Sequence, residues 1–248
     1  MNRAVIVTGA GRGIGRAYAL RFARDGYGVT IADLNVAGAH AVRDEIAAAG
    51  GTAIAVRTDV AGEADCRACV ARTLEAFGRV DVLINNAALF ADIVRRPFWE
   101  LDAAEWDSVL GVNARGTWQM MKAVTPAMQA QRSGSIINIA SNTFLSGVSG
   151  FAHYIASKGA VIGLTRSAAR DLGEYNVRVN CILPGLTRTE VERTVDEPGR
   201  YDQLLRSQSI KRVGVPGDLV GTVAFLASSD SSFMTGQALT VDGGNTFH

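Results

Sequence analysis

Three side chains that could transfer a proton together stand close in the sequence: Ser141, Tyr154 and Lys158. Tyr154 and Lys158 are four residues apart, so on a helix their side chains face the same way. An ammonium beside a phenol favours the phenolate and lowers the pKa of the tyrosine. Such a tyrosine can take a proton from an alcohol, or give one to a ketone, near neutral pH. The Ser141 hydroxyl, at the end of a separate predicted strand, could hydrogen-bond the same oxygen atom.

A glycine-rich turn near the N-terminus supplies the context for this acid–base group. An apolar, β-branched run that ends at Thr8 predicts a buried strand, and Gly9-Ala-Gly-Arg-Gly-Ile-Gly15 follows it. The glycines permit a tight turn and a close approach to a pyrophosphate, and the predicted helix Gly13–Asp25 offers its N-terminal N–H groups. The next strand, Tyr27–Ala32, ends in Asp33, whose carboxylate can accept both ribose hydroxyls of NAD and repel a 2′-phosphate. This order of elements predicts dinucleotide binding.

The choice between NAD and NADP depends on two side chains of this region. Arg12 lies inside the turn and could reach a 2′-phosphate, which would make NADP the cofactor. Asp33 opposes that phosphate, so the sequence favours NAD.

Composition sets the class of protein. With 248 residues, 48% hydrophobic content and 27 glycines, the chain fits one α/β domain spanning residues 1–248. A formal net charge of +1 gives no basic field for nucleic acid or an anionic membrane. No apolar run approaches the ~20 residues of a membrane span, and the first strand begins too near Met1 to leave room for a signal peptide. We therefore expect a cytoplasmic protein that acts on a small molecule.

Strands and helices alternate along the rest of the chain, which predicts a doubly wound parallel sheet of about seven strands with helices on both faces. Ligands in such Rossmann-like sheets bind beyond the carboxyl ends of the strands. The further predicted strands are Ala53–Asp59, Val80–Asn85, Ser135–Ala140, Val177–Leu183 and Ala238–Val241. The further predicted helices are Val36–Ala49, Glu63–Phe77, Ala103–Gln131, Phe151–Gly173 and Gly217–Ala227.

One polar and irregular stretch, residues 186–213, interrupts this alternation after Pro184-Gly185. A segment of that length inside a compact domain is usually a lid or a disordered insertion. We expect a substrate lid.

The motifs together resemble those of the short-chain dehydrogenase/reductase family, in its single-domain branch, from Val5 to about Gly244. The matching segments are Thr8-Gly-x3-Gly-Ile-Gly15, Asp59-Val60, Asn85-Asn-Ala87, Asn113, Ser141 with Tyr154 and Lys158, Pro184-Gly185, and Thr189. Two positions depart from the family pattern without touching the chemistry: Ala88, where glycine is usual, and Thr187, where a branched apolar residue is common.

The resemblance implies a role for each matching residue. Tyr154 is the catalytic base, Ser141 orients the substrate oxygen, and Lys158 holds the nicotinamide ribose. Asn113 kinks a helix so that its carbonyl holds a water of a proton relay. Together, the turn and the resemblance assign these residues to the cofactor: Gly9, Arg12, Gly13, Ile14, Gly15, Asp33, Leu34, Asp59, Val60, Asn86, Ala87, Tyr154, Lys158, Pro184, Gly185, Thr187 and Thr189.

The implied activity is hydride transfer between a secondary alcohol and NAD, with a ketone or aldehyde as the product. Two stretches, residues 139–145 and 241–248, resemble NAD-dependent enzymes that oxidise aromatic alcohols, such as 1-phenylethanol dehydrogenase and pyridoxal 4-dehydrogenase. An inactive dinucleotide-binding scaffold is the alternative from another class, although it would not need all four residues of the implied active site. A nucleotide-sugar epimerase would need an added substrate domain.

The substrate side of the site leaves several interpretations open. Phe144, Leu145 and Phe151 could form an apolar wall or could pack in the core, and His153 could line the pocket or face a subunit contact. Arginines at 95, 96, 188 and 193 could bind an anionic sugar, polyol or other alcohol, although a solvated basic face is the default. The candidate substrate residues are Arg95, Asn142, Phe144, Phe151, His153 and Arg188.

Two further features concern metals and assembly. Cys66 and Cys69 have half of a metal-site spacing, but they lie in a predicted helix without further ligands, so we expect packing and no metal. The predicted helices Ala103–Gln131 and Phe151–Gly173 carry apolar residues on more than one face. Since relatives in the resembled family are usually tetramers with these helices at an interface, we expect a homotetramer.

Overall fold

The computed structural model describes residues 3–191 and 199–247. Seven strands form one sheet in the order β3-β2-β1-β4-β5-β6-β7, and every neighbouring pair is parallel. Their bounds are β1 Ala4–Thr8, β2 Gly28–Asp33, β3 Thr52–Arg57, β4 Val82–Asn85, β5 Gly134–Ile139, β6 Val177–Pro184 and β7 Ala238–Val241. The predicted Rossmann-like α/β fold is confirmed.

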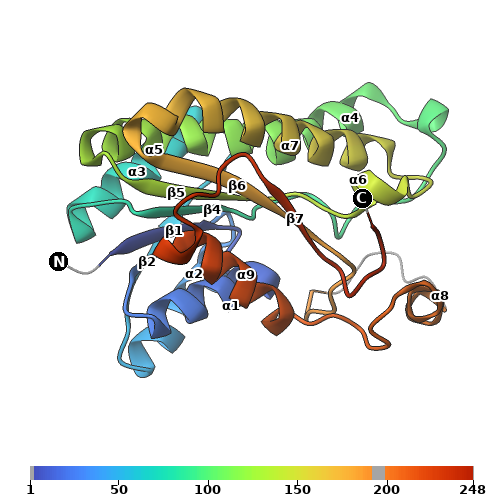
Figure 1. The fold of residues 1–248 in the computed structure, drawn as a ribbon, viewed down its shortest axis with the longest axis horizontal. Coiled ribbons are helices and arrows are strands. Elements are labelled where there is room, and N and C mark those ends of the chain that lie inside the picture. Colours follow the sequence, from blue (N-terminus) through green and yellow to red (C-terminus); the bar gives the residue numbers. More distant parts are fainter. Residues whose placement is uncertain (1–2, 192–198, 248) are drawn as a thin grey trace.

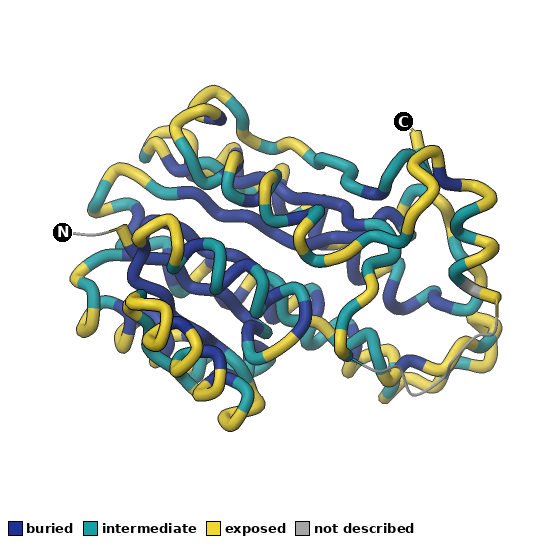
Figure 2. The backbone as a smooth tube through the Cα atoms, turned by 90° about the horizontal axis from the view of Figure 1, so that it is seen from below, coloured by how far each residue is buried: buried dark blue, intermediate teal, exposed yellow. Residues whose placement is uncertain are grey.

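Helices cover both faces of the sheet (Figure 1). On one face lie α1 (Gly13–Arg24), α2 (Val36–Ala48) and α9 (Gly217–Ala227). On the other lie α3 (Glu63–Phe77), α4 (Ala103–Leu110), α5 (Thr117–Gln131) and α7 (Ala152–Leu172). Two hydrophobic clusters fill the layers between helices and sheet, one on each face. In Figure 2 the strands are accordingly buried, whereas the helices alternate between buried and exposed residues.

The strands read as continuous apolar runs because both faces of a doubly wound sheet are covered. All five residues of β1 are buried, and so are the first five of β2. After β3 the chain returns to the other side of β1 to form β4, so the strand order reverses between β1 and β4. Such a reversal leaves a crevice at the carboxyl ends of the two strands, where ligands bind in sheets of this kind.

Two predicted elements differ from the structure. The continuous helix predicted for Ala103–Gln131 is instead α4, a π-helical turn at Gly111–Gly116, and α5. A π turn adds a residue to the repeat, which apolar periodicity does not reveal. The stretch 186–213, predicted to be irregular, contains α8 (Arg200–Ser207), and its residues 192–198 lie outside the described part. A short helix, α6 (Thr143–Ser146), is also additional to those predicted.

The described residues contain no helix that is both long enough and apolar enough to cross a membrane.

Candidate active site

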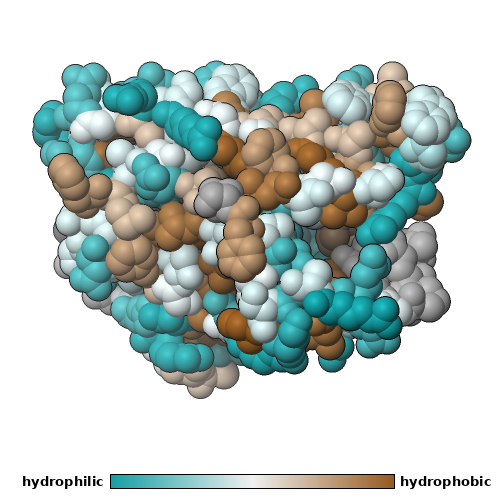
Figure 3. Space-filling model, turned by 45° about the vertical axis from the view of Figure 1, so that its right-hand side comes forward, coloured by the Kyte–Doolittle hydropathy of each residue, from teal (hydrophilic) through white to brown (hydrophobic). Residues whose placement is uncertain are grey.

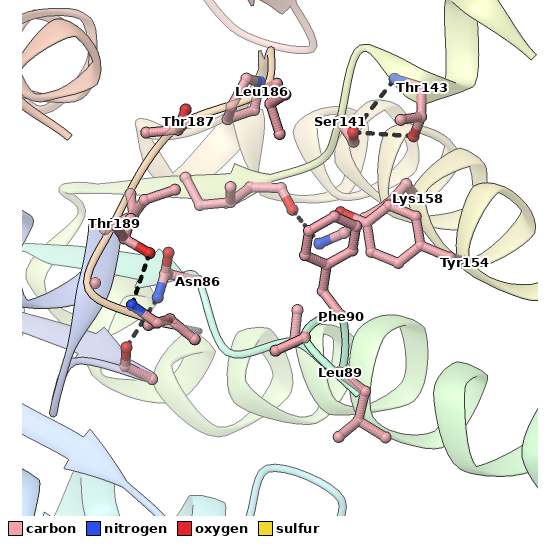
Figure 4. Close-up of a pocket in the computed structure, with 18 of the residues that line it drawn as sticks. Asn86, Leu89, Phe90, Ser141, Thr143, Tyr154, Lys158, Leu186, Thr187 and Thr189 are labelled. Carbon is pink, nitrogen blue, oxygen red and sulfur yellow. Dashed lines mark hydrogen bonds between the residues drawn. The ribbon is translucent and has the colours of Figure 1, made fainter. Parts of the chain in front are cut away.

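A cavity of about 830 Å³ lies at the carboxyl edge of the sheet. Its walls come from the segments that follow β1 to β6, from α7, and from the region around α8. In Figure 4, Ser141 and Tyr154 lie on one side of this cavity, Leu186, Thr187 and Thr189 on another, and Leu89 and Phe90 below. All seventeen residues that the sequence assigned to the cofactor line it.

The glycine turn fits tightly against the segment after β4. Gly9 has a φ of +61°, and a Cβ atom on it would lie 2.8 Å from the Cα of Ala87. A Cβ on Gly15 would collide with the Gly9 carbonyl oxygen. The Asn86 side-chain amide donates hydrogen bonds to the carbonyls of Thr8 and Gly9, each at 3.0 Å. Side chains are therefore excluded where the backbone of the turn must pass closest to its neighbours.

Asp33 stands at the end of β2, at the rim of the cavity. Its Oδ2 accepts a hydrogen bond from the Gly11 N–H at 2.8 Å, and its Oδ1 accepts one from the Asn35 N–H at 2.8 Å. These bonds fix the carboxylate directly beside the glycine turn. The arrangement places a negative charge where the predicted adenosine ribose would lie.

Ser141, Tyr154 and Lys158 line the cavity beyond β5, which β1 and β4 separate from β2 and Asp33. Tyr154 and Lys158 are both buried on α7, and the Lys158 Nζ lies 5.6 Å from the centroid of the Tyr154 ring. Lys158 donates a hydrogen bond to the Ile139 carbonyl at 2.7 Å. Burial lowers the pKa of the ammonium to about 8. The Ser141 Oγ follows β5 and accepts hydrogen bonds from the N–H (3.2 Å) and the hydroxyl (2.9 Å) of Thr143.

Asn113 lies in the π-helical turn and does not line the cavity. Its side chain accepts a hydrogen bond from the Leu89 N–H at 2.8 Å and donates to the Leu89 carbonyl and the Ser157 hydroxyl, at 3.2 and 3.1 Å. Its own carbonyl accepts a hydrogen bond from the Thr117 hydroxyl at 2.7 Å. The side chain thus holds the segment that follows β4 against α7.

An apolar wall surrounds Tyr154. Leu89, Phe90, Val148 and Phe151 line the cavity there, and all four belong to one hydrophobic cluster with Tyr154. The Phe90 and Tyr154 ring centroids are 4.9 Å apart. Only Phe151 was singled out from the sequence, because the other three stand in loops without a motif.

Polar groups occupy the side of the cavity nearest the C-terminus. The Asn142 side-chain amide donates to Asp242 Oδ2 at 3.1 Å and to Asn245 Oδ1 at 3.3 Å, and Asn245 in turn donates to the Ser207 hydroxyl at 2.8 Å. Asn142, Ser207 and Asn245 all line the cavity, together with Tyr201 and Gln203. No motif predicted Tyr201, Gln203, Ser207 or Asn245, which the fold brings in from α8 and the C-terminal tail.

Three candidate substrate residues lie away from the cavity wall. Phe144 is 45% exposed, with its ring against Gly159 on α7. His153 is fully buried, and its Nε2 lies 3.4 Å from Glu105 on α4. The Arg188 guanidinium lies over the ring of Tyr201, 4.5 Å from its centroid. His153 directly precedes Tyr154 on α7 and nevertheless points away from the cavity, since successive helical side chains diverge.

Of the other arginines, Arg95 does line the cavity, with its guanidinium 4.8 Å from the centroid of the Phe151 ring. Arg96 lies 3.7 Å from Glu105, and Arg193 is outside the described residues.

The cysteine pair belongs to the core. Cys66 and Cys69 are fully buried on α3, and burial raises their pKa values to about 11 and about 12. Both thiols pack in the cluster beneath α3, α5 and α7.

Comparison with known proteins gives matches over nearly the full chain. A family model described as enoyl-(acyl carrier protein) reductase matches residues 9–246. The chain is 39% identical to the 3-oxoacyl-(acyl-carrier-protein) reductase FabG of Staphylococcus epidermidis, over 98% of this chain and 99% of that protein. It is 38% identical to BbsD of Thauera aromatica, a subunit of (2S)-((R)-hydroxy(phenyl)methyl)succinyl-CoA dehydrogenase, over 99% and 97% of the two chains. A solved structure of 7α-hydroxysteroid dehydrogenase, complexed with NADH and 7-oxo glycochenodeoxycholic acid, has a TM-score of 0.92 at 35% identity, covering 98% and 93%.

Proposed function

The chain belongs to the short-chain dehydrogenase/reductase family of oxidoreductases acting on CH–OH and carbonyl groups, and on this basis we propose that it transfers a hydride between a secondary alcohol and NAD. The product is the corresponding ketone or aldehyde. One observation carries the proposal: Ser141, Tyr154 and Lys158 line the same cavity as the glycine turn and Asp33.

The residues present fit a dinucleotide. A side chain has no room at Gly9 or Gly15, so the backbone of the turn can lie against a pyrophosphate there. Asp33 and Lys158 both line the cavity, and each could hydrogen-bond one of the two riboses of a dinucleotide. The volume of about 830 Å³ lies in the upper part of the range of ~300–1,000 Å³ that small-molecule sites occupy.

Each residue of the acid–base group has a distinct role in the proposed reaction. Tyr154 takes the hydroxyl proton of the alcohol as base, and Ser141 holds the same oxygen by a hydrogen bond. Lys158, as a cation, favours the phenolate of Tyr154 and holds the ribose nearby. Asn113 keeps the wall at Leu89 in place and connects the proton path to solvent. When bound, the nicotinamide supplies the acceptor for the hydride.

Asp33 is the residue that selects NAD. A 2′-phosphate would meet its carboxylate, and like charges placed together cost several kcal/mol. We expect Asp33→Ser to raise kcat/KM for NADP relative to NAD by at least about tenfold. Steady-state rates with both cofactors, at one alcohol concentration, measure this ratio; an unchanged ratio would mean that Asp33 does not select the cofactor.

The apolar wall supports an aromatic or other apolar alcohol as the substrate. Leu89, Phe90, Val148 and Phe151 surround the ring of Tyr154, so a bulky apolar substituent on the carbinol carbon would be enclosed there. The name of the Thauera aromatica relative describes a hydroxy(phenyl)methyl group, which is an alcohol of this kind.

An anionic alcohol, sugar or polyol is the second candidate, because Arg95 lines the cavity beside Phe151. NADH formation from NAD decides between the two when it is followed with secondary aryl alcohols, benzylic alcohols, polyols, and alcohols that carry a carboxylate or sulfonate. Turnover of the neutral aryl alcohols supports the first candidate, and turnover only of the anionic ones supports the second. No turnover of any alcohol by a protein that binds NADH would instead support an inactive scaffold.

A further inference from the structure

The segment after β6 is held to the fold at two places, and the second of them is the glycine turn. At its base, Thr187 pairs with Gly214 as a short parallel bridge, and the Arg188 N–H donates to the Gly214 carbonyl at 2.8 Å. At its far end, the Glu190 Oε1 accepts a hydrogen bond from the Gly13 N–H at 2.8 Å. Leu186, Thr187, Thr189 and Val191 line the cavity between or beside these two attachments.

The far attachment supplies what the start of α1 lacks. Gly13 is the first residue of α1, Arg12 before it makes no side-chain cap, and the first turn contains no acidic residue. Glu190 therefore contributes the acceptor and the negative charge that stabilise a helix N-terminus. That hydrogen bond lowers the pKa of the Glu190 carboxyl, helped by the charges of Arg16 and Arg12.

Packing reinforces the hydrogen bond. A Cβ atom on Gly13 would lie 3.2 Å from Val191 Cγ2, so Val191 lies directly on the glycine turn. The Thr189 hydroxyl accepts a hydrogen bond from the Val191 N–H at 3.2 Å, which stiffens the segment between the two attachments (Figure 4).

We propose that Glu190 is a positioning residue of the cofactor site: its carboxylate pins the segment Leu186–Val191 to the first turn of α1 and so retains the bound dinucleotide. The inference rests on the proposed function, because it takes the glycine turn as the seat of the pyrophosphate. A carboxylate at this place also repels a pyrophosphate. The hydrogen bond and the charge thus act in opposite directions, and substitution can separate them.

The test measures NADH affinity and NADH release in the full-length protein, by fluorescence titration and stopped-flow displacement. Glu190→Ala removes both the acceptor and the charge, and we expect the Kd and the dissociation rate of NADH to rise about three- to tenfold. Glu190→Gln keeps the acceptor, and we expect its Kd to lie within about twofold of the wild-type value or below it. Asp202→Ala, which removes an exposed carboxylate on α8, is the matched control for charge and leaves the Kd unchanged.

Hydrogen exchange of the Gly13 amide gives an independent reading in the protein without cofactor. We expect protection in the wild type and in Glu190→Gln, and faster exchange in Glu190→Ala. Either of two results would overturn the inference: Glu190→Ala binding NADH as tightly as the wild type or more tightly, or Glu190→Gln being as weak as Glu190→Ala. A wild-type protein that does not bind NADH contradicts the proposed function and this inference with it, whereas intact wild-type binding isolates the role of Glu190.

Discussion

Lys158 carries a charge that the fold disfavours. Its ammonium is buried against β5 with the Ile139 carbonyl as hydrogen-bond acceptor, and burial lowers its pKa from 10.5 to about 8. Below pH 8 the folded protein therefore holds a buried charge at Lys158, which lowers its free energy of unfolding. An uncharged residue at this position would not have that cost. The proposed reaction explains why the cation is kept, since it stands beside Tyr154.

This cost predicts a pH dependence of stability. Between about pH 8 and 10.5 the unfolded chain binds a proton at Lys158 that the folded chain has lost, so stability rises with pH across this window. We expect wild type to gain up to about 3 kcal/mol relative to Lys158→Met over that range. Urea unfolding of both proteins measures the difference, and the other titrating groups cancel between them. A difference that stays constant with pH would contradict the lowered pKa.

The site residues that could be predicted from the sequence are those that belong to a motif. The turn Gly9–Gly15, Asp33 and the pair Tyr154 with Lys158 lie at fixed offsets from strand ends, so their meeting at one edge of the sheet follows from the predicted topology. For Phe144 and His153, by contrast, the sequence offers only their nearness to Ser141 and Tyr154. Which way such a side chain points depends on packing that no spacing encodes.

The π-helical turn between α4 and α5 is the element on which the wall at Leu89 depends. Asn113 makes three side-chain hydrogen bonds there, and the Thr117 hydroxyl donates to the Asn113 carbonyl. We expect Asn113→Ala to cost about 3 kcal/mol or more, because it leaves several partly buried groups without partners. Thr117→Val removes one bond and should cost about 1 kcal/mol. Urea unfolding compares them, and equal costs would show that the Asn113 side chain does not organise this region.

Strands and most helices follow from the sequence because burial on both faces gives long apolar runs, and amphipathic helices separate them. The bounds of α3, α9 and β7 match the prediction, and others shift by a few residues. The failures have local causes. A π turn leaves the apolar pattern of Ala103–Gln131 looking continuous, and α8 is a helix of only eight residues inside a polar stretch. The proposed role of residues 186–213 as a lid remains a prediction.

The surface suggests assembly. Trp106 on α4 and Trp118 on α5 are 37% and 43% exposed. Separately, on the face that Figure 3 shows, several hydrophobic side chains lie near the centre among hydrophilic ones. Exposed aromatic residues of this kind are enriched where proteins associate. We expect a homotetramer, so light scattering after size-exclusion chromatography should give four times the mass of one chain. Trp118→Glu on α5 should shift the mass toward smaller species, and a wild-type monomer would contradict the prediction.

The central claim is that Tyr154 performs acid–base chemistry on an alcohol while the glycine turn and Asp33 hold NAD. The most direct measurement is NADH formation by wild type and Tyr154→Phe with the best alcohol of the panel, with NADH binding measured in the same samples. Removing a general base typically costs ~10²–10⁴-fold in rate, so we expect a fall in kcat of that size with NADH binding unchanged. A variant that reduces NAD at the wild-type rate would contradict the account.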